Sequence, residues 1–140
     1  MGDGRMVLDT NIVLDLYLFD DPSVQVLRQE IDAASHRWLA TRDMRDELER
    51  VLAYPRIVGA LARRQIDAAA VLAQFDRFAC LQAPPAPAGV RCRDPDDQKF
   101  LDLALAHGSA LLSRDRALLE LAGKLELLGV NALSATGFAA

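Results

Sequence analysis

The 140-residue sequence has few cysteines and histidines, which limits the chemistry open to it. Its two cysteines, Cys80 and Cys92, lack CxxC spacing, so we expect both to be reduced and to have no structural role. Its two histidines, His36 and His107, are far apart and have no cysteine at metal-ligand spacing. A disulfide framework and a zinc site are therefore both disfavoured.

Long apolar runs and an excess of basic residues are also missing. No apolar run reaches the roughly 18–20 residues that span a bilayer, and the first residues lack the regions of a signal peptide. We therefore expect a cytoplasmic protein with no membrane partner. The net charge is −4, whereas proteins that bind nucleic acid regardless of sequence are usually basic. Six arginines between positions 42 and 64 still allow a nucleic-acid substrate, although they also fit ordinary solvated helix faces.

Hydrophobic residues are plentiful, at 51% of the chain, and we expect residues 1–140 to form a single domain. Apolar runs predict strands over 5–9, 36–41, 109–113 and 125–130. Helical periodicity, with residues typical of helix ends, predicts helices over 20–34, 42–54, 56–65, 67–81, 96–107 and 116–124, and a last turn in 134–140. The proline-rich segment 82–90 is expected to be an extended connector.

Strands that alternate with helices are typical of an α/β fold with a parallel sheet. Because 42–80 is predicted to hold helices only, we expect a helical insert after the second strand. Asp9 ends the first predicted strand, and Asp115 follows the strand at 109–113. The carboxyl ends of parallel strands share one edge of the sheet, where sites form, so these two carboxylates can approach each other.

Helical periodicity places two further acids. At about 100° per residue, Leu101 lies within about 40° of Asp97, so Asp97 shares the apolar face of its helix. Asp102 and Gln98 are expected on the solvent side of the same helix. Glu47 lies at the edge of an apolar stripe and is the acid of its own helix best placed to reach a cleft, although a solvated role is the alternative.

The segment "RCRDPDDQKFLDLALAHG", residues 91–108, has two interpretations. Asp94 at the N-cap and Pro95 at the first helical position make a good helix start. Acids in a first turn also stabilise a helix by about 0.3–1 kcal/mol each. Capping accounts for Asp94 and in part for Asp96, but less well for the inward position of Asp97, which is therefore a candidate site residue.

If these acids converge, their charge needs compensation. Two like charges about 4 Å apart repel by roughly 4 kcal/mol at an effective dielectric constant of about 20, so such a cleft requires a cation or shifted pKa values. A set of oxygen ligands suits Mg²⁺ or Mn²⁺. These ions lower the pKa of bound water and stabilise phosphoryl oxygens, so we expect metal-assisted phosphodiester hydrolysis.

Four motifs in this order and spacing resemble one known family. They are "VLDTNIVL", "RDELERVLAYPRI", "CRDPDDQKFLDLALAHGSALLSRDRALL" and "LELLGV", and together they span about residues 6–138. The sequence resembles the PIN domain family, and more narrowly the VapC-like group of toxins from toxin–antitoxin systems. The "DPDDxKFLxLA" motif followed by a strand and "SRD" is the most specific part of the resemblance.

The resemblance implies a Mg²⁺- or Mn²⁺-dependent endoribonuclease with a Rossmann-like α/β/α sandwich. It places the catalytic acids at Asp9, Glu47, Asp97 and Asp115, with Asp9, Asp97 and Asp115 as metal ligands. Glu47 would bind a second metal or position the attacking water. Asn11 and Ser113 would support the site, and Asp94 and Asp96 would support the metal or cap the helix. Candidate RNA-backbone contacts are Arg42, Arg45, Lys99, Arg114 and Arg116. The implied partners are RNA, a cognate antitoxin and a second copy of the chain in a homodimer.

Two other functions share some of these features. A PIN-like domain without catalysis would serve protein binding or regulation. An aspartate-phosphorylated phosphatase or receiver domain also places an acid at the end of its first strand. The phosphatase needs a second aspartate where this chain has Asn11, and the receiver needs a lysine after a later strand, which is missing from "LLSRDRALL".

Overall fold

A sheet of parallel strands lies at the centre of the computed structural model, which describes residues 4–139. Within that range the sheet has five strands in the order β3-β2-β1-β4-β5, and every neighbouring pair is parallel. The strands are β1 (Arg5–Leu8), β2 (Arg37–Ala40), β3 (Ala79–Leu81), β4 (Ala110–Leu112) and β5 (Ala132–Leu133). The predicted α/β fold with a parallel sheet is confirmed.

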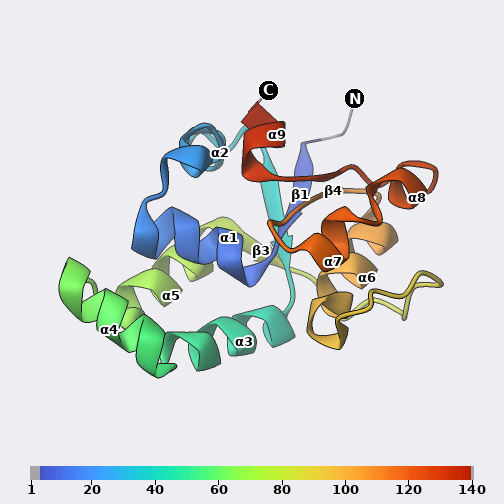
Figure 1. Ribbon diagram of the computed structural model, residues 1–140. Coiled ribbons are helices and arrows are strands. Elements are labelled where there is room, and N and C mark those ends of the chain that lie inside the picture. Colours follow the sequence, from blue (N-terminus) through green and yellow to red (C-terminus); the bar gives the residue numbers. More distant parts are fainter. Residues whose placement is uncertain (1–3, 140) are drawn as a thin grey trace.

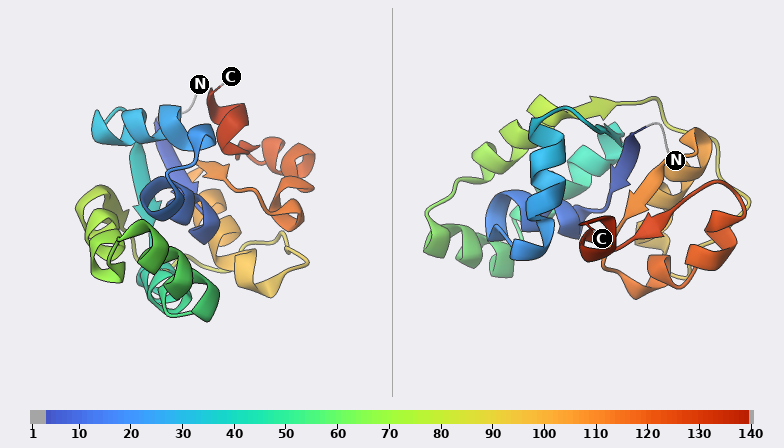
Figure 2. Two further views of the ribbon diagram at one scale, coloured as in Figure 1. Left: turned by 60° about the vertical axis from the view of Figure 1, so that its left-hand side comes forward. Right: turned by 90° about the horizontal axis from the view of Figure 1, so that it is seen from above.

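Helices connect the strands and cover the sheet (Figure 1). The longer ones are α2 (Gln25–Asp32), α3 (Arg42–Leu52), α4 (Pro55–Arg64), α5 (Ala68–Phe78) and α6 (Gln98–His107). The shorter ones are α1 (Thr10–Leu14), α7 (Arg116–Leu119), α8 (Ala122–Glu126) and α9 (Ala135–Ala139). Figures 1 and 2 show α3, α4 and α5 grouped on one side of the molecule and α6, α7 and α8 on the other. The first group is the helical insert predicted after the second strand.

Several helix boundaries follow from local chemistry. The Asp21 carboxylate accepts from the Ser23 amide in the 3₁₀ turn that precedes α2, and the Thr41 side chain caps α3 by accepting from the Met44 amide. Gly108 ends α6 with φ at +60°, the left-handed conformation that glycine adopts without strain.

Two strand predictions need correction. The segment 125–130 is not a strand: Leu125 is buried in α8, whereas Leu127 is 88% exposed, and Gly129 turns the chain at φ +85°. The last strand, β5, follows at Ala132–Leu133. In addition, 79–81 forms the short edge strand β3 and does not continue helix α5. A three-residue apolar segment has too little length for strand and helix periodicities to be distinguished.

The connector 82–90 lacks helix and strand, as predicted, but is held to α6 by two side chains. Gln98 accepts from the Cys92 amide at 2.7 Å and donates to the Val90 carbonyl at 2.9 Å. Asp102 accepts from the Ala88 amide at 3.0 Å and from Gln98 at 2.8 Å. Their predicted place on the solvent side is therefore wrong, since both are half-buried beneath the connector.

The order of the strands determines where a site can form. From β1 the chain passes to β2 and β3 on one side, and then returns to place β4 on the other side of β1. Leu8 pairs with Leu112 at the carboxyl ends of β1 and β4, next to this reversal. Crevices at such switch points are the usual sites of open α/β sheets.

Two expectations from composition can be compared with the structure. Cys80 and Cys92 are both free thiols. None of the helices within residues 4–139 has the length and hydropathy needed to cross a bilayer.

Candidate active site at the carboxyl end of the sheet

Asp9, the first residue after β1, is buried and held at both carboxylate oxygens. As the N-cap of α1, its Oδ1 accepts from the amides of Asn11 at 2.8 Å and Ile12 at 3.3 Å. Its Oδ2 accepts from the hydroxyl of Ser113, which follows β4. The Ser113 Oγ in turn accepts from the Asp115 amide at 2.8 Å. Ser113 therefore links the two acids that follow the neighbouring strands β1 and β4.

Asp97 lies in a group of three carboxylates. It ends the 3₁₀ turn Pro95–Asp97 that leads into α6, and only 9% of the residue is exposed. One carboxylate oxygen from each of Asp94, Asp97 and Asp115 lies within 4.8 Å of the others. Asp97 Oδ2 is buried and has no hydrogen-bond partner. A buried carboxylate oxygen without a donor is costly, so this oxygen requires a proton or a cation.

The pKa values show how strongly these carboxylates are perturbed. The pKa of Asp97 is raised to about 8, first by burial, then by a hydrogen bond with Asp115 and by the charges of Asp115, Asp94 and Asp9. Burial also raises the pKa of Asp9, against the hydrogen bonds from Ser113 and the backbone, and the Asp115 charge adds to the rise. The electrostatic field of the site therefore disfavours full ionisation unless positive charge is bound.

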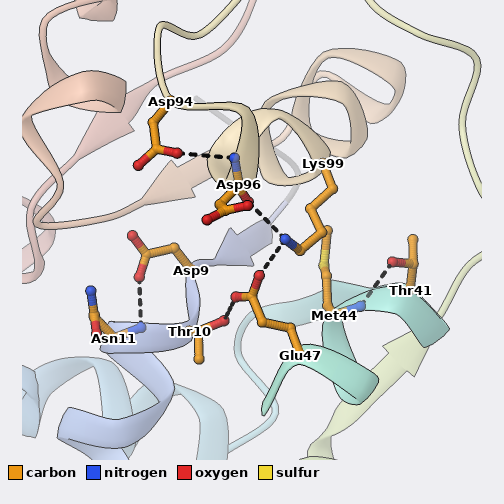
Figure 3. A network of polar contacts seen from close by, with 9 residues as sticks. All are labelled: Asp9, Thr10, Asn11, Thr41, Met44, Glu47, Asp94, Asp96 and Lys99. Carbon is orange, nitrogen blue, oxygen red and sulfur yellow. Dashed lines mark hydrogen bonds and ion pairs between the residues drawn. The ribbon is translucent and has the colours of Figure 1, made fainter. Parts of the chain in front are cut away.

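Glu47 reaches the same region from α3, on the other side of the cleft (Figure 3). Its carboxylate accepts from the hydroxyl of Thr10 and from the ammonium of Lys99. Lys99 also donates to the Asp96 carbonyl at 2.7 Å. These contacts connect α1, α3 and the start of α6, so Glu47 is positioned by a hydrogen-bond network within the protein.

A cleft of about 330 Å³ lies between these elements. Its lining residues are Asp9, Thr10, Asn11, Glu47, Arg50, Val51, Tyr54, Asp96, Asp97 and Phe100. Asp97 belongs both to this lining and to the group with Asp94 and Asp115. It is therefore the point at which the carboxylate group meets the open cleft.

The structure brings together many of the residues predicted from the sequence. Asp9, Asn11, Glu47, Asp96 and Asp97 line the cleft, Asp94 and Asp115 adjoin Asp97, and Ser113 bridges Asp9 to Asp115. One detail differs from expectation. The predicted metal ligands are Asp9, Asp97 and Asp115, whereas the three carboxylates found close together are those of Asp94, Asp97 and Asp115. Asp94 also caps the turn by accepting from the Asp96 amide at 3.0 Å.

The predicted basic residues are less uniform in position. Arg42 pairs with Asp46 at 3.1 Å on α3, and Arg45 pairs with Asp76 of α5 at 2.7 and 2.9 Å. Arg114 pairs with the buried Asp15 at 3.1 Å, and Arg116 is exposed beside the site. Of the predicted basic residues, Lys99 has the closest connection to the cleft, because it binds the lining residue Glu47.

Five lining residues were not among the predicted site residues: Thr10, Arg50, Val51, Tyr54 and Phe100. Arg50 follows Glu47 by three positions on one face of α3, and Tyr54 lies two residues beyond the end of that helix, at the N-cap of α4. This spacing was available in the sequence, but it has meaning only once Glu47 is known to face a cleft.

Together, the fold and this acidic cleft are those of a nuclease-type α/β domain. A comparison with family models agrees: residues 5–117 match the PIN domain, so the chain belongs to the PIN domain family. A comparison with curated proteins gives no match. PIN domains are generally nucleases and typically use divalent metal ions. The donor set fits such an ion, since it consists of carboxylate oxygens and includes the unpartnered Asp97 Oδ2.

Proposed function

We propose that this protein is a Mg²⁺- or Mn²⁺-dependent endoribonuclease that hydrolyses RNA phosphodiester bonds. The observation that carries the proposal is the buried, unpartnered Oδ2 of Asp97, close to Asp94 and Asp115 at the edge of an open cleft. A purely structural cluster would be expected to satisfy a buried oxygen with a protein donor. Oxygen-only ligands favour Mg²⁺ or Mn²⁺ over zinc.

Asp97, Asp94 and Asp115 would hold the ion, with Asp9 adjacent to them. A divalent cation bound there would supply positive charge to phosphoryl oxygens and lower the pKa of a water. Asp9 has both oxygens engaged by Asn11, Ile12 and Ser113, so it adds negative charge in a fixed orientation. Ser113 supports both Asp9 and the loop that presents Asp115, which is the role expected of an outer-shell hydrogen-bond partner.

Glu47 acts from the opposite wall of the cleft, on α3, and Lys99 reaches it from the start of α6. The Lys99 ammonium holds one Glu47 oxygen and the Thr10 hydroxyl holds the other, which fixes the carboxylate toward the space between α1 and α6. In that position Glu47 orients a water for attack on the phosphorus, and Lys99 brings positive charge close to the carboxylates. Hydrolysis forms the bond from the water oxygen to phosphorus and breaks the bond to the leaving ribose oxygen, which takes up a proton.

The biological role proposed is that of a toxin in a toxin–antitoxin pair, acting in the cytoplasm as a homodimer and neutralised by an antitoxin protein. This part rests on the sequence resemblance to the VapC-like group. Growth arrest on induced expression, relieved by Asp97→Asn, is the result expected for a toxin. Unimpaired growth with an active enzyme would instead indicate a nuclease with another role.

The enzymatic proposal is tested by incubating purified protein with structured and unstructured RNA in Mn²⁺, Mg²⁺ or EDTA. We expect cleavage only with a metal ion, and its loss in Asp97→Asn. Asp67→Asn is a matched control, because Asp67 is exposed and its side chain makes no capping hydrogen bond. Metal-independent cleavage, or equal activity in Asp97→Asn, would contradict the proposal.

The principal alternative is a PIN-like module that binds a protein and has no catalytic activity. It predicts no cleavage of any RNA by a folded protein that still binds Mn²⁺. The aspartate-phosphorylation alternative is less favoured, because Asp9 is only 3% exposed and both of its oxygens already accept hydrogen bonds.

A further inference from the structure

Part of the cleft is lined by residues that are not acidic. Arg50 and Tyr54 line it together with Val51, and both Arg50 and Tyr54 are exposed. Tyr54 is 54% exposed, which makes it an accessible aromatic ring in a pocket whose other aromatic residue, Phe100, is buried at 2%. An exposed ring beside a catalytic cleft presents a flat apolar face to whatever enters.

The backbone beneath this ring is fixed. The Tyr54 amide donates to the Val51 carbonyl at 3.0 Å, and the Tyr54 carbonyl accepts from the Val58 amide at 2.8 Å. Pro55 follows and begins α4. The ring is therefore carried by a rigid corner between α3 and α4, so contacts to a ligand need little ordering of the backbone.

Arg50 adds positive charge to the same cleft from the last turn of α3, four residues before Tyr54. Within residues 4–139 its guanidinium makes no hydrogen bond or ion pair, whereas Arg42 and Arg45 of the same helix are paired with Asp46 and Asp76. It is thus a cation at the cleft that is available to a ligand. A phosphate contact from Arg50 and a base stacked on Tyr54 fit one nucleotide of an unpaired strand.

We propose that Tyr54 and Arg50 form a subsite for a single-stranded nucleotide next to the scissile phosphate. The subsite stacks one base on Tyr54, contacts its phosphate through Arg50, and selects unpaired RNA over duplex. In a duplex that base is stacked within the helix, and its face is not available to the tyrosine. The inference rests on the proposed ribonuclease function and specifies the substrate of the same cleft.

The test is binding of a short single-stranded RNA carrying 2-aminopurine, measured by fluorescence in the Asp97→Asn background so that no substrate is consumed. Loss of one base–aromatic stack weakens binding by roughly 5- to 150-fold. We expect a loss of that size in Tyr54→Ala, together with loss of the quenching that stacking causes. Tyr54→Phe should restore both, whereas Tyr54→Leu, which keeps apolar area without a ring, should not.

A second set of variants tests the charge of Arg50 and provides controls outside the cleft. Arg50→Gln should weaken binding and reduce its dependence on salt, whereas Arg37→Gln should do neither, because Arg37 lies at the amino end of β2, the opposite edge of the sheet. Leu127→Ala removes an exposed apolar side chain that does not line the cleft, and it should leave RNA binding unchanged. Circular dichroism and thermal unfolding verify that the variants are folded.

The outcomes separate this inference from the proposed function. Cleavage by the wild type with unchanged RNA affinity in Tyr54→Ala would overturn the subsite and leave the ribonuclease intact. Tyr54-dependent RNA binding without cleavage in any metal would support the subsite and contradict the ribonuclease. Equal affinity for duplex and single strand, or a change in oligomer size alone in Tyr54→Ala, would overturn the subsite and point to a protein contact.

Discussion

The ammonium of Lys99 on α6 donates to the carboxylate of Glu47 on α3, and this ion pair spans the acidic cleft. The two side chains are only 26% and 17% exposed, so the pair is shielded from water more than an ordinary surface pair. Lys99 therefore places a positive charge beside Glu47, for which the family resemblance implied either a second metal ion or the attacking water. We expect one Mn²⁺ per chain, measured by isothermal titration calorimetry or electron paramagnetic resonance.

Lys99→Met tests this relationship. Removal of the ammonium leaves a partly buried Glu47 without its cation, so we expect the free energy of unfolding to fall by about 1–2 kcal/mol, between the effects of exposed and buried pairs. We also expect a second, weaker Mn²⁺ to bind. Urea denaturation and Mn²⁺ titration measure the two effects. If Lys99→Met still binds only one ion, the Lys99 ammonium is not what prevents Glu47 from binding a metal ion.

The pH dependence of stability follows from the raised pKa of Asp97. In the unfolded chain an aspartate ionises near pH 4, whereas in the fold the pKa is raised to about 8. Between these values the folded state retains a proton that the unfolded state has lost, so the metal-free protein loses stability as pH rises from about 4 to 8. Urea unfolding in EDTA at several pH values measures this slope, and Asp97→Asn should flatten it.

Added Mn²⁺ provides the matched comparison for that slope. An ion that binds only the folded protein stabilises it, and it competes with the proton on Asp97, so the stabilisation should grow as pH rises. A metal-free protein that gains stability between pH 5 and 8 would contradict the assigned shift. Stabilisation by Mn²⁺ that is independent of pH would place the ion away from Asp97.

The sequence predicted most where the signal is local. The first strand and the helix start at Asp94 and Pro95 are local features, and the structure agrees with both, except that β1 ends at Leu8, one residue before Asp9. The inward position of Asp97 followed from the periodicity of α6, and the residue is indeed buried. These features need only the nearest residues, which is why a single sequence was sufficient.

What the sequence could not supply depends on distant partners. Lys99 and Glu47 are 52 positions apart, so their pairing cannot be read from spacing. The membership of Asp94 in the carboxylate group was left undecided, because helix capping and metal binding use the same residue type and both occur here. The strand at Ala132–Leu133 is too short to show periodicity and forms because β4 offers a free edge.

Ser113→Ala should affect both stability and metal binding. The residue is fully buried, and its hydroxyl donates to Asp9 and accepts from the Asp115 amide. Loss of both contacts should cost about 1–3 kcal/mol of unfolding free energy, because the buried Asp9 carboxylate and the part-buried Asp115 amide each lose a partner. Mn²⁺ affinity should fall by roughly 10- to 100-fold, as is common when an outer-shell partner is removed.

Ser109→Ala is the control for that substitution. Ser109 is equally buried at 2%, but its hydroxyl bonds only to the adjacent Ala110 carbonyl at 3.2 Å, far from the carboxylates. It should leave Mn²⁺ affinity unchanged. If the two alanine variants lose Mn²⁺ affinity to the same extent, the effect is one of general stability and Ser113 has no specific part in the site.

The connector also contributes to the site, because it leads directly into Asp94. Asp102 and Gln98 on α6 hold the backbone at Ala88, Val90 and Cys92. Gln98→Leu removes the hydrogen bonds that this side chain makes to Val90, Cys92 and Asp102, so we expect a loss of about 1–2 kcal/mol and faster amide exchange at Cys92. Because the backbone that leads into Asp94 is then held less firmly, Mn²⁺ affinity should fall as well. Gln65→Leu, at the exposed end of α4, should change neither the free energy of unfolding nor the Mn²⁺ affinity.

Hydrogen exchange measured by mass spectrometry locates the effect of Gln98→Leu: the expected pattern is loss of protection over 88–94 with α3 unchanged. Uniform loss across the chain would show that Gln98 stabilises the fold as a whole and not the entry to the carboxylate group.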